Sequence, residues 1–301
     1  MKKLLALALA MSMTFAITAC SSSSSTSTDV TTDTATTDTA TTETTTAPET
    51  TVETTEEESA ELELIKEGVL VVGTEAKYAP YEFVMLDESG KEVFAGFDMD
   101  LAREIAADMG LELEIVDLPF DSIMLELQAG NIDMAIAGLS PKEERQAVAD
   151  FSQIYFAAEQ AVVINSANAD VFVDQASLAG YQVAAQNGSI QADHVLEDMV
   201  ESTFVGYADI PEILYELKLG NVSAAIIEAP VIEALLAENP DLMIIDSFID
   251  EDKEGNVVCV KKEAPNLLTS VDETITRLLD DGTMDQFVAD AYIAMDQAID
   301  Y

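Results

Sequence analysis

The sequence predicts an α/β fold made of two similar halves. Short apolar stretches alternate with stretches of helical periodicity, an order typical of mostly parallel sheets with right-handed crossovers. Residues 125–138 (LELQAGNIDMAIAG) and 215–228 (YELKLGNVSAAIIE) each read as a helix end, a Gly-Asn stop and a small-residue strand. About 240 residues follow a non-globular beginning, which is enough for two α/β lobes or one large domain.

The first half contains three predicted strands and two predicted helices. Residues 68–73 are a short apolar stretch ended by glycine, typical of a buried strand. Residues 97–109 have apolar side chains at helical spacing, with Asp98 as a candidate N-cap and Gly110 as the stop. The remaining elements are a strand at 111–116, a helix at 120–128 and a strand at 132–137.

The second half repeats this order and is followed by a helical tail. The predicted elements are strands at 182–185, 204–207, 222–227 and 257–260, and helices at 190–200, 210–219, 230–237, 267–279 and 284–295. If the tail packs on the first half, the chain crosses between the halves twice, near 157–160 and near 247–252. Ligands of open α/β sheets bind at the carboxyl ends of strands. The segments at Gly138 and at Glu228 are therefore expected to face a shared cleft.

The first sixty residues are predicted to lie outside the fold. Residues 1–3 are a positive n-region, 4–17 an apolar stretch too short for a comfortable membrane span, and Ile-Thr-Ala-Cys at 17–20 resembles a bacterial lipobox. The resemblance implies a signal peptide at 1–19 and lipidation of Cys20, the alternative being an ordinary secretory signal. Residues 20–60 are Ser/Thr-rich and weakly acidic, which predicts a disordered tether.

Composition excludes several functions. The chain has 58 acidic residues against 13 basic ones and a net charge of −45, which argues against nucleic acid as a partner. With Cys20 lipidated, Cys259 is the remaining cysteine, and His194 is the sole histidine, so no disulfide framework, zinc site or histidine-based triad is expected. No Walker pattern occurs, so we expect no ATP hydrolysis, no cofactor and no metal.

Five motifs in order resemble one family, the bacterial extracellular solute-binding proteins of family 3. They are VGTEAKYAPYEF (72–83), GFDMDLAREIA (96–106), QAGNIDMAIAGLSPKEERQAVADFSQIYF (128–156), QNGSIQ (186–191) and DDGTMDQF (280–287). The resemblance covers 66–301. It implies a two-lobed, type II periplasmic-binding-protein-like fold, with lobe 1 at 61–158 plus 250–301, lobe 2 at 159–249, and two crossover strands.

The resemblance also implies a function without catalysis. Family members capture an amino acid by hinge closure of the two lobes and deliver it to an ABC permease that has a separate ATPase. We therefore expect a monomer on the extracellular face of the cell membrane, anchored through its lipid, which would be the periplasmic side in a cell with two membranes.

Five residues match the family positions that bind the amino-acid backbone. Arg145 matches the arginine that grips the α-carboxylate, and Ser140 matches the hydroxyl that completes this nest. Gly138 matches the position whose backbone contacts the ligand amine. Ser189 opens a helix whose N–H groups suit a carboxylate. Glu228 matches an acid that takes the α-ammonium, although many members have aspartate there.

Three further residues match positions around the ligand side chain. Tyr78 and Phe120 match two aromatic walls, and Glu75 matches a position that reads the side chain in some relatives and would favour a basic or amide-bearing ligand. Alternative interpretations stay open for several residues: Glu75 as a cap of the strand–loop junction, Tyr78 as a core aromatic, and Glu228 as a solvated acid.

Arg145 also has a simpler interpretation. It could lie on the face of a surface helix that starts with Pro141 at its first position, and pair there with Glu143 or Glu144.

Two other functions remain alternatives. A few proteins of this fold are lyases or dehydratases of small acids, and Glu228 or Glu75 could then move a proton. A sensory ligand-binding module is the other.

Overall fold

A computed structural model describes residues 62–249 and 255–299. The predicted signal peptide, Cys20 and the tether lie outside the described residues.

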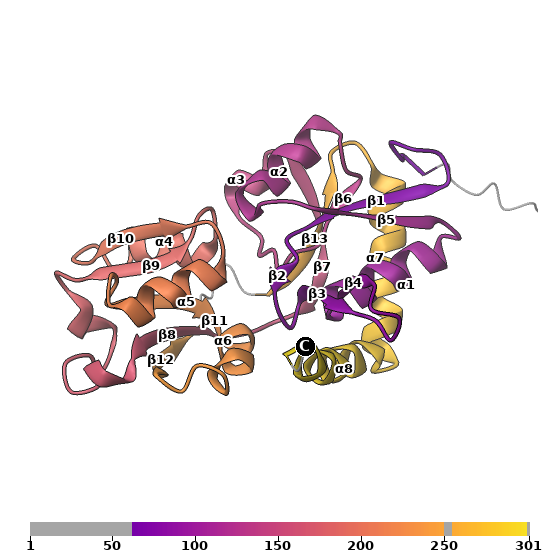
Figure 1. The fold of residues 1–301 in the computed structure, drawn as a ribbon. Coiled ribbons are helices and arrows are strands. Elements are labelled where there is room, and N and C mark those ends of the chain that lie inside the picture. Colours follow the sequence, from indigo (N-terminus) through magenta and orange to yellow (C-terminus); the bar gives the residue numbers. More distant parts are fainter. Residues whose placement is uncertain (1–61, 250–254, 300–301) are drawn as a thin grey trace, which may run out of the picture. The chain divides into compact units, whose positions relative to one another are not determined.

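The first lobe is built on a five-stranded sheet (Figure 1). Its strand order is β5-β1-β6-β13-β7. The strands are β1 (Val69–Thr74), β5 (Glu112–Asp117), β6 (Met134–Ala135), β7 (Ala149–Phe156) and β13 (Asn256–Lys261). β1 pairs in parallel with both β5 and β6, whereas β13 is antiparallel to β6 and β7.

Helices cover both faces of this sheet because its side chains alternate between two apolar clusters. α1 (Phe97–Asp108) and α7 (Pro265–Asp280) pack on the face of Leu70 and Val72, and α2 (Phe120–Ala129) packs on the face of Val69 and Val71. α8 (Thr283–Ile299) packs against α1. A small sheet of β2 (Lys77–Tyr78), β3 (Glu82–Leu86) and β4 (Glu92–Ala95) lies between β1 and α1 in the sequence.

The second lobe has a sheet of the same size, with strand order β10-β9-β11-β8-β12. Its strands are β8 (Gln160–Asn165), β9 (Gln182–Gln186), β10 (Thr203–Tyr207), β11 (Ala224–Glu228) and β12 (Leu242–Phe248). α4 (Ile190–Glu197) packs on one face, and α5 (Ile210–Leu219) and α6 (Ala229–Leu236) pack on the other (Figure 1). Two short 3-10 helices, Ser166–Asn168 and Gln175–Leu178, precede β9.

Both sheets are mixed, where the sequence predicts mostly parallel ones. Each contains three parallel strands, β5-β1-β6 and β10-β9-β11. The strands that enter directly from the other lobe, β8 and β13, run antiparallel to their neighbours. β7 ends at Phe156 and β8 begins at Gln160, while β12 ends at Phe248 and β13 begins at Asn256.

The internal repeat predicted from the sequence has the same local geometry in both lobes. α2 and α5 end at Gly130 and Gly220, which adopt left-handed conformations with φ of 72° and 75°. The asparagine after each glycine donates to a helix glutamate at 2.6 Å, Asn131 to Glu126 and Asn221 to Glu216. Glycine is favoured at such caps because it lacks a Cβ.

The predicted helices and strands are present, with some different ends. The predicted helix at 190–200 ends at Glu197, and the predicted strand at 132–137 pairs only over β6. Backbone hydrogen bonds to β1 continue on both sides of β6, from Asp133 N–H to the Val71 carbonyl (2.8 Å) and from Ile136 N–H to the Gly73 carbonyl (3.1 Å). The Asp133 carboxylate also accepts from the N–H groups of Ile65 (2.7 Å) and Val71 (3.0 Å). Strands β2, β3, β4, β7, β8 and β12 have no counterpart in the sequence prediction. The short helix α3 (Glu143–Gln146) matches only the alternative in which a surface helix starts at Pro141.

The predicted N-cap of α1 is wrong. Gly96 occupies the N-cap position with φ 110°, and a Cβ there would lie 2.1 Å from the Tyr81 carbonyl oxygen, so only glycine fits. Asp98 is fully buried inside the first turn. Its carboxylate accepts from the Gly138 N–H (2.9 Å) and the Tyr155 hydroxyl (2.8 Å), so it supports the cleft and caps nothing.

Candidate functional site

Six of the eight predicted ligand residues line one pocket, to which both lobes contribute. The first lobe supplies Tyr78, Phe120, Ala137, Gly138, Ser140 and Arg145, and the second supplies Gln186, Ser189, Ile190 and Gln191. Most of these residues lie at or just after the carboxyl end of a strand, or at the start of the following helix. The pocket thus lies where ligands of α/β sheets bind, and the other two predicted residues, Glu228 and Glu75, are not among the residues that line it.

Arg145 is a buried cation with no acidic partner among residues 62–249 and 255–299. Its side chain is 6% exposed. Nη1 donates to the Ser140 carbonyl (2.7 Å), Nη2 donates to the Gly188 carbonyl (3.2 Å), and the guanidinium carbon lies 5.5 Å from the centre of the Phe120 ring. Burial lowers the pKa of Arg145, but a guanidinium stays charged at any physiological pH. The cleft thus contains a positive charge that an anion can neutralise.

The surface-helix interpretation of Arg145 is wrong. α3 begins at Glu143 with Lys142 as its N-cap, so Pro141 precedes the helix. Arg145 turns inward to the two backbone carbonyls, and no ion pair joins it to Glu143 or Glu144 in the described part of the chain.

The N-terminus of α4 faces Arg145 from the second lobe. Ser189 is its N-cap: the hydroxyl accepts from the Ala192 N–H (3.1 Å) and donates to the Gln186 carbonyl (2.8 Å). The hydroxyl is therefore committed to the cap. What the turn offers a ligand is its first helical N–H groups, which carry partial positive charge.

Glu228 provides negative charge at the end of β11. It is 3% exposed, so the solvated alternative is wrong. Oε2 accepts from the Tyr78 hydroxyl (3.1 Å), and Oε1 lies 3.5 Å from the Asn256 Nδ2 donor. Burial raises the pKa of Glu228 to about 7, because these neutral donors compensate its charge only in part.

Gly138 connects this acid to the wall of the cleft. Its φ is 53°, and an added Cβ would lie 3.1 Å from the Tyr78 ring, so a larger residue would crowd the pocket. Its N–H donates to Asp98, and its carbonyl accepts from Asn256 Nδ2 at 2.9 Å. The carbonyl and the Glu228 carboxylate thus share one donor and lie close together.

Glu75 lies beside this pocket and in an adjoining one. It is 4% exposed, and its Oε2 accepts from Gln186 Nε2 at 2.8 Å. The adjoining cavity, about 290 Å³, is lined by Glu75, Lys77, Asp117, Leu118, Pro119, Ala208 and Asp209. Burial raises the pKa of Glu75 to about 7. This end of the cleft has an excess of acidic groups.

The two lobes are closed on each other. Lys77 pairs with Asp209 at 2.7 Å, and Lys142 pairs with Asp193 at 2.5 Å, and both pairs join the first lobe to the second. The pocket containing Arg145 has a volume of about 10 Å³. Small-molecule sites ordinarily have about 300–1,000 Å³. A solute can therefore enter only when the lobes move apart.

Several residues that hold the cleft together are not among those predicted from the sequence. Asp98 and Asn256 hold Gly138, Gln186 holds Glu75, and Lys142 reaches across to Asp193. The motif at 96–106 contains Asp98, but only the folded chain brings it to Gly138, forty residues later. Asn256 opens β13, and no local pattern marks it.

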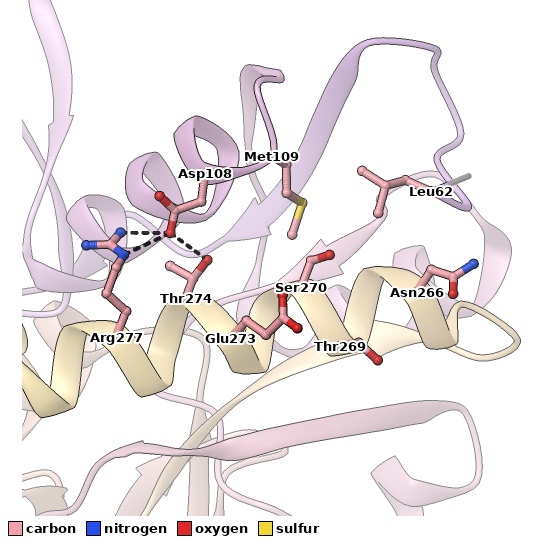
Figure 2. Close-up of a pocket in the computed structure, with 9 residues that line it drawn as sticks. All are labelled: Leu62, Asp108, Met109, Asn266, Thr269, Ser270, Glu273, Thr274 and Arg277. Carbon is pink, nitrogen blue, oxygen red and sulfur yellow. Dashed lines mark hydrogen bonds and ion pairs between the residues drawn. The ribbon is translucent and has the colours of Figure 1, made fainter. Parts of the chain in front are cut away.

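A larger cavity, about 660 Å³, lies elsewhere, between the end of α1 and α7 of the first lobe. Figure 2 shows Arg277 and Thr274 of α7 directed toward Asp108 at the end of α1. Asp108 Oδ2 accepts from Thr274 Oγ1 (3.0 Å), Arg277 Nε (3.1 Å) and Arg277 Nη2 (2.8 Å). Asp108, Thr274 and Arg277 thus satisfy one another's hydrogen-bonding groups.

The described residues contain neither a candidate metal site nor a candidate membrane span. Within 62–249 and 255–299, no group of three or more His, Cys, Asp or Glu side chains could hold a metal. Cys259 is buried in β13 as a core residue. No helix in the described ranges is both long and apolar enough to span a membrane.

Comparisons with known proteins agree with this geometry. A family model for the bacterial extracellular solute-binding proteins, family 3, matches residues 70–292. The arginine-binding extracellular protein ArtP of Bacillus subtilis (strain 168) is 29% identical over 222 residues, which are 72% of this chain and 83% of ArtP.

Solved structures share the fold. The amino acid ABC transporter substrate-binding protein AbpA from Streptococcus pneumoniae, bound to L-arginine, is 33% identical with a TM-score of 0.72, over 76% of this chain and 96% of that one. The ancestral amino acid-binding protein AncCDT-1, a precursor of cyclohexadienyl dehydratase, is 27% identical with a TM-score of 0.65, over 75% of this chain and 95% of that one. With its two sheets, its two chain crossings and a family match over residues 70–292, the chain belongs to the bacterial extracellular solute-binding proteins of family 3.

Proposed function

We propose that this chain is the substrate-binding component of an ABC importer and captures a free amino acid between its two lobes. The observation that carries the proposal is that two buried groups of opposite charge meet the same pocket: Arg145 lines it, and Glu228 accepts a hydrogen bond from Tyr78, which also lines it. Arg145 is a buried cation without an acidic partner in the described ranges, and Glu228 is a buried acid held only by neutral donors. An amino acid supplies a carboxylate for the first and an ammonium for the second.

The backbone of the ligand would be held by both lobes. The α-carboxylate binds to Arg145, to Ser140 and to the N–H groups of the first turn of α4, after Ser189. Glu228 and the Gly138 carbonyl take the α-ammonium. Because these groups come from both lobes, the bound ligand stabilises the closed form over the open one.

The side chain is proposed to be basic, with L-arginine the first candidate. Tyr78 and Phe120 give the pocket aromatic walls, and a guanidinium packs well on such faces. Glu75 lies at the border with a cavity that also contains Asp117 and Asp209, so a positive charge there would be compensated. The arginine-binding relatives support the same choice.

Family membership and the leader sequence support the remaining parts of the proposal, which are the lobe bounds, the oligomeric state, the membrane anchor and the transport partners. Lobe 1 comprises 61–158 and 250–301, and lobe 2 comprises 159–249. The chain is a monomer, lipidated at Cys20, tethered by 20–60 to the extracellular face of the membrane, and recognised when closed by a permease with a separate ATPase. It carries out no catalysis. Mass spectrometry of the membrane fraction tests the anchor, since a Cys20→Ala variant would lack the lipid mass.

The first experiment is thermal unfolding of residues 61–301, stripped of co-purified solute, with single amino acids added. Ligand at 1,000 times its dissociation constant adds about 4 kcal/mol of stability, which is on the order of ten degrees for a domain of this size. L-Arginine or L-lysine should give the largest shift, and agmatine, which lacks the carboxylate, a much smaller one. A flat response to every amino acid would exclude the proposal.

A small-acid dehydratase is the second candidate, favoured by the similarity to AncCDT-1 and by a Glu228 pKa of about 7, which suits proton transfer. Incubation with a cyclohexadienyl acid distinguishes the two. An aromatic product that requires Glu228 would establish the enzyme.

A further inference from the structure

A buried pair of acids, Glu82 and Asp98, lies behind the cleft and has no part in the proposed ligand contacts. Glu82 is on β3 and Asp98 in the first turn of α1, and both are fully buried. Asp98 accepts hydrogen bonds from Gly138 and Tyr155. Neither oxygen of Glu82 accepts a hydrogen bond from a donor group of residues 62–249 or 255–299.

The surroundings of Glu82 are unsuited to a negative charge. The charged groups that interact electrostatically with Glu82 are three acids, Asp98, Glu75 and Glu228. The buried tyrosines Tyr78 and Tyr155 are also close enough to interact with it electrostatically. An ionised carboxylate without donors or a counter-charge is too costly to bury, so such a group keeps its proton. Burial first, and then the negative charge of Asp98, raise the pKa of Glu82 well above its usual range.

A protonated carboxyl group is a donor and needs an acceptor when it is buried. The Asp98 carboxylate is next to Glu82 and already receives two hydrogen bonds, which favour its ionised form. Two carboxyl groups at such close range cannot both ionise, and one shared proton satisfies both.

We propose that Glu82 is a positioning residue for the amino-acid site: it stays a neutral acid and donates its proton to Asp98, which holds the Gly138 N–H and the Tyr155 hydroxyl. Gly138 forms the cleft wall next to Glu228. Tyr155 is the second-last residue of β7, just before the chain crosses to β8. The shared proton therefore fixes both the ligand-binding turn and the start of a crossing. The consequence for affinity rests on the proposed function, whereas the protonation of Glu82 does not.

Infrared spectroscopy tests the proton without any ligand. The wild-type spectrum minus the Glu82→Gln spectrum at pH 7.5 isolates Glu82, because Glu75 and Glu228 are present in both proteins. We expect the carbonyl stretching band of one protonated carboxylic acid in the difference. A difference spectrum with only carboxylate bands would overturn the proposal. Asp133→Asn is the matched control: this fully buried acid has donors from Ile65, Val71 and Lys261, and its removal should take away carboxylate bands alone.

Amide hydrogen exchange tests the positioning role, again without ligand. Glu82→Gln keeps a donor toward Asp98, and Glu82→Met removes it at similar size. We expect the Gly138 amide to exchange about tenfold faster in Glu82→Met and at the wild-type rate in Glu82→Gln. Equal rates in all three proteins, or equal acceleration in both variants, would overturn the role.

Affinity for L-arginine then connects the pair to the site. We expect Glu82→Gln to bind within about threefold of wild type and Glu82→Met about tenfold more weakly. If Glu82→Met bound L-arginine as tightly as wild type, the positioning role would be lost. If wild type bound no amino acid, the proposed function would fail, and the infrared and exchange results would still decide the state of Glu82.

Discussion

Replacing Arg145 with alanine should abolish tight amino-acid binding while leaving the fold intact. Two of the five guanidinium N–H groups donate to the Ser140 and Gly188 carbonyls, which leaves three for a ligand carboxylate. The side chain is 6% exposed, so a carboxylate bound there is largely desolvated. Removing one partner of such a buried pair costs about 3–5 kcal/mol. The affinity for L-arginine should therefore fall roughly 150- to 5,000-fold.

Titration calorimetry with two ligands separates this effect from general damage. Agmatine is L-arginine without the α-carboxylate, so wild type should prefer L-arginine by a large factor, and Arg145→Ala should lose most of that preference. Arg145→Lys should recover only part of it, because an ammonium cannot form the two parallel hydrogen bonds of a guanidinium. Arg103→Ala is the matched control, since Arg103 forms an exposed pair with Asp100 at 2.6 Å.

Two results would refute the reasoning. One is L-arginine affinity in Arg145→Ala within about fivefold of wild type. The other is an undiminished preference for L-arginine over agmatine in that variant, which would show that another group binds the carboxylate.

Three further outcomes are expected. Glu228→Gln should weaken amino-acid binding by about 1.5–3 kcal/mol. The affinity of the wild type should also fall as the pH drops below about 7, because Glu228 then gains a proton. Calorimetry between pH 5.5 and 8.5 measures both effects, and an affinity that does not change with pH would contradict the role of Glu228. Without ligand, the pKa of Glu75 and of Glu228 in the folded protein is about 7 and that of Asp98 is about 6, all above their unfolded values. The free energy of unfolding should therefore decrease as the pH rises from about 4.5 to 7, which urea unfolding measures. Lys142→Met should destabilise the closed form by about 1 kcal/mol, because it removes a cross-lobe ion pair that is partly screened by solvent. Stopped-flow experiments should then show faster ligand release, and an unchanged release rate would show that this pair does not hold the lobes together.

The order of elements could be predicted because local signals specify it. The Gly-Asn stops at 130–131 and 220–221 require a left-handed glycine, and the helix that ends at each was placed within a residue. β1, β9 and β11 were recognised from short apolar stretches. Of the six strands without a predicted counterpart, β7, β8 and β12 mix polar with apolar side chains, and β2, β3 and β4 form a small separate sheet.

The cleft residues could be placed only through resemblance to a family. Composition and spacing marked Arg145 as unusual but left its direction open, toward a surface helix or into a cleft. Asp98 illustrates the limit of local rules: its position beside Gly96 has the pattern of a helix cap, yet the side chain is buried against Gly138 and Tyr155. A capping pattern is visible in four neighbouring residues, whereas a contact across forty residues is not.

The sequence by itself determined the two-lobed α/β order, the repeat in both lobes and the family, because each depends on residues that are close along the chain. Only the tertiary structure decided which charges meet. It joined Glu228 to Tyr78 and Asn256, left Arg145 facing backbone carbonyls, and placed Glu82 against Asp98 without a donor. The protonation of a buried acid depends on the groups that surround it in space, and those groups come from strands and helices that the chain brings together only on folding.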